Sequence, residues 1–267
     1  MATLRELSNL KGRKALITGA AGGLGQIFAE TLAELGADLI LIDLPGTNLA
    51  SIAEKLNQDW GVTVENISCD LENQIHRSDL IKQVTTTKSN LNILVNNAAL
   101  VGSSDLRGWS VPFEQQSIDT WRRAVEVNLT AVFDLCQGFT PLMENAEGAN
   151  IVNIASIYGY LAPYWQIYEN SELSNPAAYG ATKAGLIQFT RWLSTTLAPK
   201  IRANSISPGG IYRGQPAEFV KRYIERTPVG RMGDENDFRG AIAYLSSDLS
   251  KYVTGTNLIV DGGWSAS

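Results

Sequence analysis

A glycine-rich turn stands between an apolar run and an amphipathic run near the start of the chain. Residues 14–18 form the apolar run, residues 18–25 read TGAAGGLG, and residues 24–35 have apolar side chains at helical spacing before Gly36. Glycine lets a backbone approach a ligand closely, and the free N–H groups at a helix start favour a phosphate. A strand, this turn and a helix in succession therefore predict a nucleotide-binding unit of an open α/β sheet.

The alternation of short apolar runs and amphipathic runs continues to the end of the chain. We predict strands at residues 14–18, 38–43, 62–68, 91–96, 150–154, 202–207 and 257–260, and helices at 24–35, 48–59, 73–86, 117–144, 177–197, 217–226 and 235–246. Continuous apolar runs such as DLILID suit strands that are covered on both faces. The pattern predicts a single α/β domain over residues 1–267, a doubly wound (Rossmann-type) parallel sheet with helices on both faces.

Composition excludes several classes of protein. The net charge of −5 argues against a nucleic-acid partner, which would favour a basic chain. No apolar run approaches the length of a membrane span, and the first residues lack the apolar core of a signal peptide. Cys69 and Cys136 lie far apart and form no CxxC pair, as expected in a reducing compartment. We therefore expect a cytoplasmic protein with no membrane partner.

The chain has one histidine, His76, in the polar stretch ENQIHRSDLIKQV. A Ser-His-Asp hydrolase, a histidine-rich metal site or a histidine base would all have to use this one side chain. The polar helical pattern around it predicts a surface residue instead, and we predict no metal site.

Two aspartates follow predicted strands and are candidates for cofactor binding. Asp43 ends the second strand, where a carboxylate can accept hydrogen bonds from both adenosine-ribose hydroxyls and would repel the 2′-phosphate of NADP. No arginine follows it, so NAD is favoured over NADP; the alternative is an aspartate that opens a turn before Pro45. Asp70 and the backbone of Leu71 would contact the adenine, although Asp70 could equally be the N-cap of the next helix.

Tyr179 and Lys183 are four residues apart in AAYGATKAG, which puts both side chains on one face of a helix. A tyrosine has an ordinary pKa of about 10, and a neighbouring ammonium lowers that pKa by favouring the phenolate. Tyr179 could then take a proton from an alcohol as a hydride leaves the carbon, or return it in the reverse direction. Such a pair also occurs by chance on exposed helix faces, so it requires supporting residues.

Further polar residues occupy positions that could support Tyr179. Ser156 follows the fifth strand, where its hydroxyl could bond the substrate oxygen. Asn128 lies inside a long predicted helix although asparagine is a poor helix former, which suggests a helix disturbance that holds a water near Lys183. The segment 96–99, NNAA, ends the fourth strand with small residues that let a cofactor approach, with Asn97 among them.

Taken together, TGAAGGLG, NNAA, Asn128, Ser156, YGATK and SPGG resemble the short-chain dehydrogenase/reductase family nearly end to end. The resemblance implies a seven-stranded parallel sheet and catalytic roles for Asn128, Ser156, Tyr179 and Lys183. It also implies a homotetramer or homodimer formed through the helices at 118–144 and 177–197 and the C-terminal strand. The expected cofactor-binding residues are then Gly19, Gly23, Leu24, Gly25, Asp43, Asp70, Leu71, Asn97, Tyr179, Lys183, Pro208, Gly209 and Ile211, with Lys183 also holding the nicotinamide ribose.

The chain departs from the family pattern at single positions. NNAA replaces the usual NNAG, and alanine should be tolerated at residue 99 if its φ is negative. Arg213 stands where the family often has a threonine that bonds the nicotinamide carboxamide. An arginine suits a carboxylate or phosphate, so an acidic or phosphorylated substrate is one hypothesis. A solvated loop arginine is the alternative.

The largest departure is an insertion around residues 157–176, because Tyr179 follows Ser156 by 23 residues, more than the family commonly has. Its aromatic and polar side chains would suit a sugar or polyol, with Tyr164, Trp165 and Tyr168 as candidate substrate contacts beside Arg213. Packing against a neighbouring subunit is the alternative. This insertion, SPGGIYRGQP and SKYVTG resemble bacterial members of flagellin-modification and nonulosonic-acid sugar pathways. The loop with Arg107, Trp109 and Phe113 would form another wall.

The sequence therefore predicts an NAD-dependent oxidoreductase that transfers hydride between nicotinamide and a secondary alcohol or ketone of a small-molecule substrate, a sugar, sugar derivative or polyol. Two alternatives stay open at this point. One is an enzyme of the same family acting on a keto acid, acyl or steroid carbonyl. The other is a non-catalytic dinucleotide-binding regulator, against which the four filled catalytic positions argue.

Overall fold

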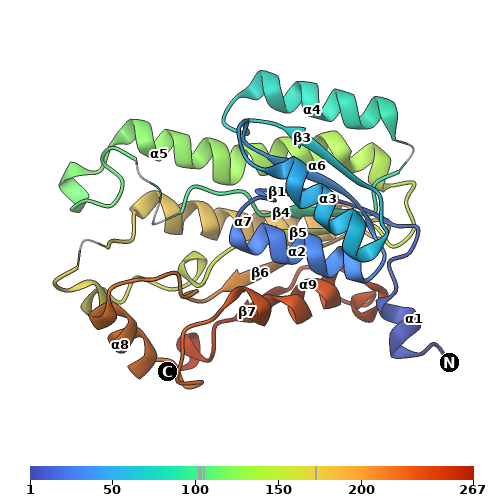
Figure 1. Ribbon diagram of the computed structural model, residues 1–267. Coiled ribbons are helices and arrows are strands. Elements are labelled where there is room, and N and C mark those ends of the chain that lie inside the picture. The colour runs from blue at the N-terminus through green and yellow to red at the C-terminus, as the bar shows by residue number, and fades with distance from the viewer. Residues whose placement is uncertain (89, 102–103, 105, 172) are drawn as a thin grey trace.

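A parallel sheet of seven strands forms the centre of the protein (Figure 1). The structure is a computed structural model that describes residues 1–267 except 89, 102–103, 105 and 172. The strand order is β3-β2-β1-β4-β5-β6-β7, and every neighbouring pair is parallel. The strands are β1 (Lys14–Thr18), β2 (Asp38–Asp43), β3 (Val64–Ser68), β4 (Ile93–Asn96), β5 (Asn150–Ile154), β6 (Arg202–Pro208) and β7 (Asn257–Val260).

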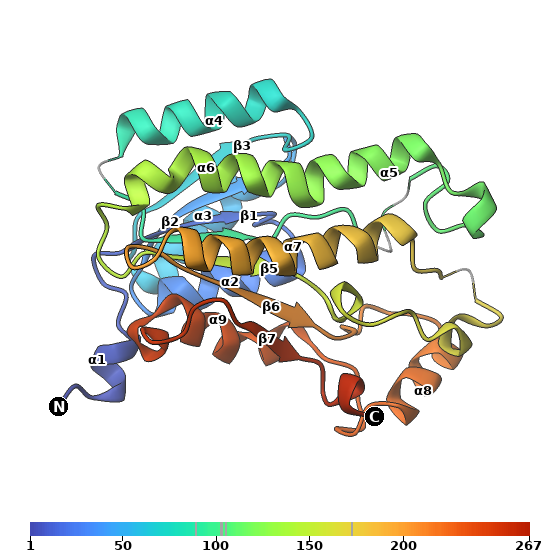
Figure 2. The same cartoon turned by 180° about the vertical axis from the view of Figure 1, so that it is seen from behind.

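Helices cover both faces of this sheet, as Figures 1 and 2 show from opposite sides. One apolar layer joins the sheet to α2 (Gly23–Glu34), α3 (Leu49–Trp60) and α9 (Arg239–Ser246). The other joins it to α4 (Gln74–Thr87), α6 (Ala131–Met143) and α7 (Ala177–Thr196), and α5 (Ile118–Val125) continues the line of α6. Two further helices, α1 (Leu4–Ser8) and α8 (Ala217–Glu225), lie at opposite ends of the molecule. The predicted doubly wound α/β domain is confirmed.

The chain order reverses at the centre of the sheet, where β1 lies between β2 and β4. Thr18 pairs with Ile42 on one side, and Ile17 pairs with Val95 on the other. In an open parallel sheet, the loops that leave the carboxyl ends of the strands separate at such a reversal and form a crevice. The glycine-rich turn after β1 and the NNAA segment after β4 therefore meet at this edge of the sheet.

Most predicted boundaries agree with the structure to within a residue or two, and the exceptions have identifiable causes. β3 and β4 begin two residues later than predicted, because Val62 and Leu91 are buried but precede the paired residues. The helix predicted at 235–246 opens as a 3₁₀ turn over Glu235–Phe238. The short helix α1 was not predicted, since none of its residues is buried and no apolar period marks it.

Other predictions concern single side chains. His76 is exposed, as predicted, and Cys69 and Cys136 are buried free thiols. Ala99 fits without strain, because Asn170 is the only non-glycine residue of the described chain with positive φ. None of the helices in the described ranges combines the length and apolar character that crossing a bilayer requires.

Candidate active site

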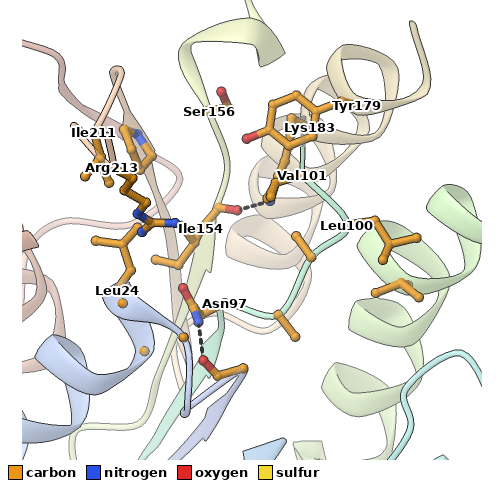
Figure 3. A pocket seen from close by; sticks show the side chains of 18 of the residues that line it. Leu24, Asn97, Leu100, Val101, Ile154, Ser156, Tyr179, Lys183, Ile211 and Arg213 are labelled. Carbon is orange, nitrogen blue, oxygen red and sulfur yellow. Dashed lines mark hydrogen bonds between the residues drawn. The ribbon is translucent and has the colours of Figure 1, made fainter. Parts of the chain in front are cut away.

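A cavity of about 800 Å³ opens at the carboxyl edge of the sheet. Its walls come from the turns after β1, β2, β3, β4, β5 and β6 and from α7 and α8. All of the residues predicted to bind a cofactor line this cavity: Gly19, Gly23, Leu24, Gly25, Asp43, Asp70, Leu71, Asn97, Tyr179, Lys183, Pro208, Gly209 and Ile211. Figure 3 shows the turn side, with Leu24, facing Ser156, Tyr179 and Lys183 across the cavity.

The glycine-rich turn can accept an anion at the start of α2. A Cβ on Gly25 would lie 2.0 Å from the Gly19 carbonyl oxygen, and one on Gly19 would lie 2.9 Å from the Ala98 Cα, so neither position has room for a side chain. Gly22 is the N-cap of α2 and provides no side-chain hydrogen bond to it. The first N–H groups of a helix lack partners within the helix. This cradle therefore fits a pyrophosphate, as the sequence predicted.

Asn97 fixes the glycine-rich turn against the end of β4. Its Nδ2 donates to the carbonyls of Thr18 and Gly19, both at 3.0 Å, and Figure 3 marks one of these two bonds. The Thr18 hydroxyl in turn accepts hydrogen bonds from the backbone N–H groups of Asn97 and Ala98, at 3.0 and 3.1 Å. The two segments that border the crevice are thus joined by side chains on both sides.

Asp43 supports the same turn from β2. One carboxylate oxygen accepts the Ala21 N–H and the other accepts the Leu44 N–H, both at 2.7 Å. An ionised carboxylate has about four acceptor positions, so both oxygens retain capacity for ribose hydroxyls. Asp70 also lines the cavity, but it accepts the Glu72 N–H. The alternative that Asp70 is the helix N-cap is wrong, because Asn73 caps α4.

Arg77 of α4 is a buried residue that the sequence did not predict to support the cavity. It is 1% exposed, and its Nη1 donates to the Leu71 carbonyl at 2.6 Å. Its other nitrogens pair with Glu126 and Asp134, at 2.6 and 2.7 Å. Arg77 thus positions the Leu71 backbone from behind. No motif marks it, and the polar pattern of α4 suggested an exposed face.

Tyr179 and Lys183 lie on one face of α7 and point into the cavity with Ser156 (Figure 3). The Lys183 ammonium is 5.8 Å from the centre of the Tyr179 ring, and its Nζ donates to the Ile154 carbonyl at 2.6 Å. Ser156 follows β5 directly, and its hydroxyl accepts the Tyr158 N–H at 3.2 Å. The strand end and the helix face therefore place the three predicted groups together.

Burial shifts the pKa values of both titratable groups. It lowers the pKa of Lys183 to about 8, because desolvation disfavours the ammonium. It raises the pKa of the Tyr179 phenol, against opposing effects of the Ser156 hydroxyl and the Arg213 cation. This direction is opposite to the lowering expected from Lys183, because desolvation outweighs the neighbouring charges. Burial thus favours the neutral form of both groups, the phenol of Tyr179 and the amine of Lys183.

Asn128 lies in a single π-helical turn, Glu126–Thr130, between α5 and α6. The Ala131 N–H donates to the Glu126 carbonyl five residues earlier, which confirms the predicted helix disturbance. The buried Asn128 amide bonds the Leu100 backbone and the Thr182 hydroxyl, at 2.7 to 3.2 Å. Asn128 therefore ties the cavity wall at Leu100 to α7, one residue before Lys183.

The insertion and α8 form part of the cavity wall. The hydroxyls of Tyr158 and Tyr168 share a hydrogen bond of 2.7 Å, and the polar side chain of Asn175 lines the same cavity. The Tyr168 ring packs on Phe219 of α8, with ring centres 5.5 Å apart. Tyr158 and Asn175, which no sequence motif marked, thus join the predicted Tyr168 in the cavity wall.

Two of the predicted substrate contacts, Tyr164 and Trp165, lie outside this cavity. Tyr164 packs edge-on against Trp264, and the Arg226 guanidinium covers its ring at 4.4 Å. Trp165 lines a separate cavity of about 450 Å³, which also contains Phe113. The placement expected for Tyr164 is wrong, because packing between the insertion and the C-terminal segment turns its ring away. Trp109 is buried near Tyr179 and donates to the Val101 carbonyl, so the predicted second wall is partly a packed core.

Arg213 lines the cavity from its glycine-turn side. It is half exposed, pairs with Glu235 at 3.1 Å, and extends past Ile211 toward Leu24 (Figure 3). Its guanidinium therefore lies beside the glycine-rich turn, 3.0 Å from where a Cβ on Gly23 would be.

Comparisons with known proteins agree with this geometry. A family model described as enoyl-(acyl carrier protein) reductase matches residues 19–265. The chain is 29% identical to the 3-oxoacyl-(acyl-carrier-protein) reductase FabG of Aquifex aeolicus, over 95% of this chain and 98% of that protein. A short-chain dehydrogenase of Leptospira borgpetersenii with bound NAD⁺ superposes with a TM-score of 0.83 at 33% identity, covering 99% and 97% of the two chains. A gluconate 5-dehydrogenase of Burkholderia cenocepacia in complex with NADP and tartrate gives 0.86 at 29% identity, covering 99% and 100%.

Proposed function

The chain belongs to the short-chain dehydrogenase/reductase family, and on that premise we propose that it is an NAD(H)-dependent oxidoreductase of sugars, sugar derivatives or other polyols. Family membership makes it an oxidoreductase that acts on alcohol and ketone groups with a nicotinamide cofactor. We infer the preference for NAD and the substrate class from the residues that line the cavity.

The preference for NAD rests on the carboxylate of Asp43. Asp43 ends β2 and faces the cavity, where the ribose hydroxyls of NAD would donate to it and a 2′-phosphate would be repelled. The structural relatives include both an NAD⁺ complex and an NADP complex, so they favour neither cofactor. The pyrophosphate would lie on the N-terminus of α2, and Lys183 would hold the nicotinamide ribose.

Three side chains of this chain perform the proton chemistry in our proposal. When bound, the nicotinamide accepts a hydride from the alcohol carbon or donates one to the carbonyl carbon. The Ser156 hydroxyl holds the substrate oxygen, and the Tyr179 hydroxyl gives or takes its proton. Lys183, held by the Ile154 carbonyl, stabilises the Tyr179 phenolate that forms when the proton leaves.

The substrate class rests on three polar side chains in the cavity wall, the hydrogen-bonded pair Tyr158 and Tyr168 together with Asn175. These neutral side chains offer hydroxyl and amide groups that match the several hydroxyls of a polyol. Among the described residues, the cavity lining contributed by the insertion and α8 carries no charged side chain. The Phe219 ring beside Tyr168 gives an apolar surface for the carbon face of a sugar. This group is the observation that carries the proposal.

Self-association is also part of the proposal. An aromatic ridge formed by Phe133, Phe189 and Trp192 lies on α6 and α7, and both outer rings are exposed. Ile259 is exposed on the edge strand β7. We propose that these surfaces join copies of the chain into a homodimer or homotetramer, and that the enzyme works in the cytoplasm.

An absorbance assay at the nicotinamide band tests the substrate class. The panel consists of polyols, aldonic acids and ketoses, with 3-oxoacyl thioesters, keto acids and steroids as the comparison set, each offered with both NAD and NADP forms. We expect turnover in the first set. Tyr179→Phe should lose at least about a thousandfold in kcat while it still binds NADH, since the acid/base group is gone. Turnover confined to the comparison set would contradict the polyol proposal. Equal rates for Tyr179→Phe and the unmodified chain would contradict the role of Tyr179.

A further inference from the structure

A short parallel backbone pairing brings Arg213 and Glu235 together. Ile211 pairs with Gly233, with Tyr212 N–H donating to the Gly233 carbonyl and Gly233 N–H donating to the Gly210 carbonyl, both at 2.9 Å. Two residues beyond each member of this pair, Arg213 Nε donates to Glu235 Oε1 at 3.1 Å. The register of the backbone therefore determines this ion pair, although the partners are 22 residues apart in sequence.

The ion pair rests on Gly23, the first residue of α2. A Cβ at Gly23 would lie 2.7 Å from Glu235 Oε1 and 3.0 Å from an Arg213 terminal nitrogen. Both charged groups therefore occupy the space that the missing side chain leaves. Arg213 lines the cavity together with Gly22, Gly23 and Gly25, so the Arg213 end of the ion pair lies beside the cradle that fits a pyrophosphate. The side chains are accessible, with 49% of Arg213 and 29% of Glu235 exposed.

The charges at the start of α2 would allow a pyrophosphate to replace the Glu235 carboxylate as the neighbouring anion. The N-terminus of α2 favours an anion, and the Glu235 carboxylate supplies one. A pyrophosphate arriving at the same helix start would repel that carboxylate. A guanidinium binds phosphate oxygens in a two-pronged geometry, and such charge-assisted hydrogen bonds are stronger than neutral ones.

We propose that Arg213 is a cofactor ligand that moves from Glu235 to the pyrophosphate, and that Glu235 competes with the pyrophosphate for the start of α2. Glu235 then lowers the affinity for the cofactor and Arg213 raises it. This role replaces the hypothesis that Arg213 recognises an acidic substrate. The proposal rests on dinucleotide binding in this cavity and is independent of the substrate class and of the role of Asp43.

Calorimetric titration with two ligands tests the proposal. NADH and ADP-ribose share the pyrophosphate, but ADP-ribose lacks the nicotinamide; if the chain prefers NADPH, the 2′-phosphorylated forms take their place. Arg213→Gln should weaken both ligands about tenfold, from the loss of charge-assisted hydrogen bonds. Glu235→Gln should tighten both several-fold. Arg239→Gln is the matched control. Arg239 pairs with Glu30 and Glu34 of α2, the helix that begins at Gly23, but it does not line the cavity.

Results other than these would contradict the proposal, and each would identify which part of it is wrong. Weaker NADH binding with unchanged ADP-ribose binding would place Arg213 on the nicotinamide instead. Unchanged affinity for both ligands in Arg213→Gln would remove its cofactor role. Weaker binding of NADH and ADP-ribose to Glu235→Gln would mean that Glu235 supports the cradle instead of competing for it. This variant tests the proposal even if Arg213→Gln fails to fold. If the unmodified chain bound neither ligand, both this inference and the proposed function would fail, whereas the other outcomes leave the proposed function intact.

Discussion

The side chain of Asn128 forms two reciprocal hydrogen bonds with the backbone of Leu100. The Leu100 N–H donates to Oδ1 at 2.7 Å, and Nδ2 donates to the Leu100 carbonyl at 3.0 Å. Leu100 lines the cavity, while Asn128 lies behind it in the π-helical turn. The helix irregularity thus provides a partner for the loop that follows β4.

Asn128→Asp tests this arrangement with almost no change in shape. The carboxylate keeps the acceptor for the Leu100 N–H but places a second oxygen against the Leu100 carbonyl. We expect the free energy of unfolding in urea to fall by about 1 to 3 kcal/mol, the range for a buried polar group that loses its partner. The control is Asn145→Asp, just after α6, where an exposed Nδ2 donates to the Pro141 carbonyl at 3.0 Å. Water can replace that bond at the surface, so stability should change by less than about 0.5 kcal/mol. Equal effects at the two positions would contradict a structural role for the Asn128–Leu100 pair.

The pKa of Lys183 predicts how stability depends on pH. In the folded chain burial lowers this pKa to about 8, whereas the unfolded chain should titrate near the ordinary value of about 10.4. Between these values the unfolded chain holds more protons, so the contribution of this group to stability rises with pH. We expect the difference in unfolding free energy between the unmodified chain and Lys183→Met to increase by on the order of 2 kcal/mol from pH 8 to pH 10.

Comparing the two proteins at each pH removes the contributions of other groups. Burial raises the pKa of Cys69 to about 11 and that of Cys136 to about 12, which acts in the opposite direction in the same pH range. Both cysteines are present in both proteins, so their effects cancel. Parallel stability curves across this range would mean that Lys183 does not titrate with a lowered pKa.

Asp43 determines the cofactor preference in our account, and Asp43→Ser tests it. Without the carboxylate the repulsion of a 2′-phosphate disappears, so the ratio of NADH to NADPH affinity should fall at least about tenfold. Affinity for NADH should also fall, because the Ala21 N–H loses its acceptor. Asp70→Asn is the control, since Asp70 lines the same cavity and should leave the ratio unchanged. If only Asp70→Asn altered the ratio, the assignment of Asp43 would be wrong.

Two equally exposed tryptophans separate the proposed interface from the insertion. Trp192 on α7 is 54% exposed and Trp165 in the insertion is 56% exposed. Trp192→Glu places a charge on the aromatic ridge and should shift the assembly toward a 29.0 kDa monomer in light scattering, whereas Trp165→Glu should not. Dissociation by Trp165→Glu alone would instead assign the insertion to the interface between subunits.

The parts of the site that the sequence predicted are those that local rules determine. The spacing of Tyr179 and Lys183 places them on one helix face whatever surrounds that helix, and strand ends bring Asp43 and Ser156 to one edge of a parallel sheet. These rules operate within a single element or between neighbouring strands. For that reason the fold, and the part of the cavity lining that comes from strand ends and from α7, could be predicted from the sequence.

The parts that the sequence did not predict depend on packing between distant segments. Tyr164 turns away because Trp264 and Arg226 accept its ring, and Arg213 lies at the glycine-rich turn because residues 211 and 233 pair. Arg77 is buried because carboxylates of another helix meet it. Neither propensity nor periodicity contains these partners. The desolvation that raises the pKa of Tyr179 likewise depends on how completely the site closes.

A titration of the purified chain with NADH and with NADPH, followed by nicotinamide fluorescence, shows directly whether the site binds a dinucleotide and which one it prefers. We expect NADH to bind at least about tenfold more tightly than NADPH, because Asp43 repels the 2′-phosphate. Equal or tighter binding of NADPH would contradict the role of Asp43 and the assignment as an NAD-dependent enzyme. Binding of neither nucleotide would contradict the proposed oxidoreductase function as a whole.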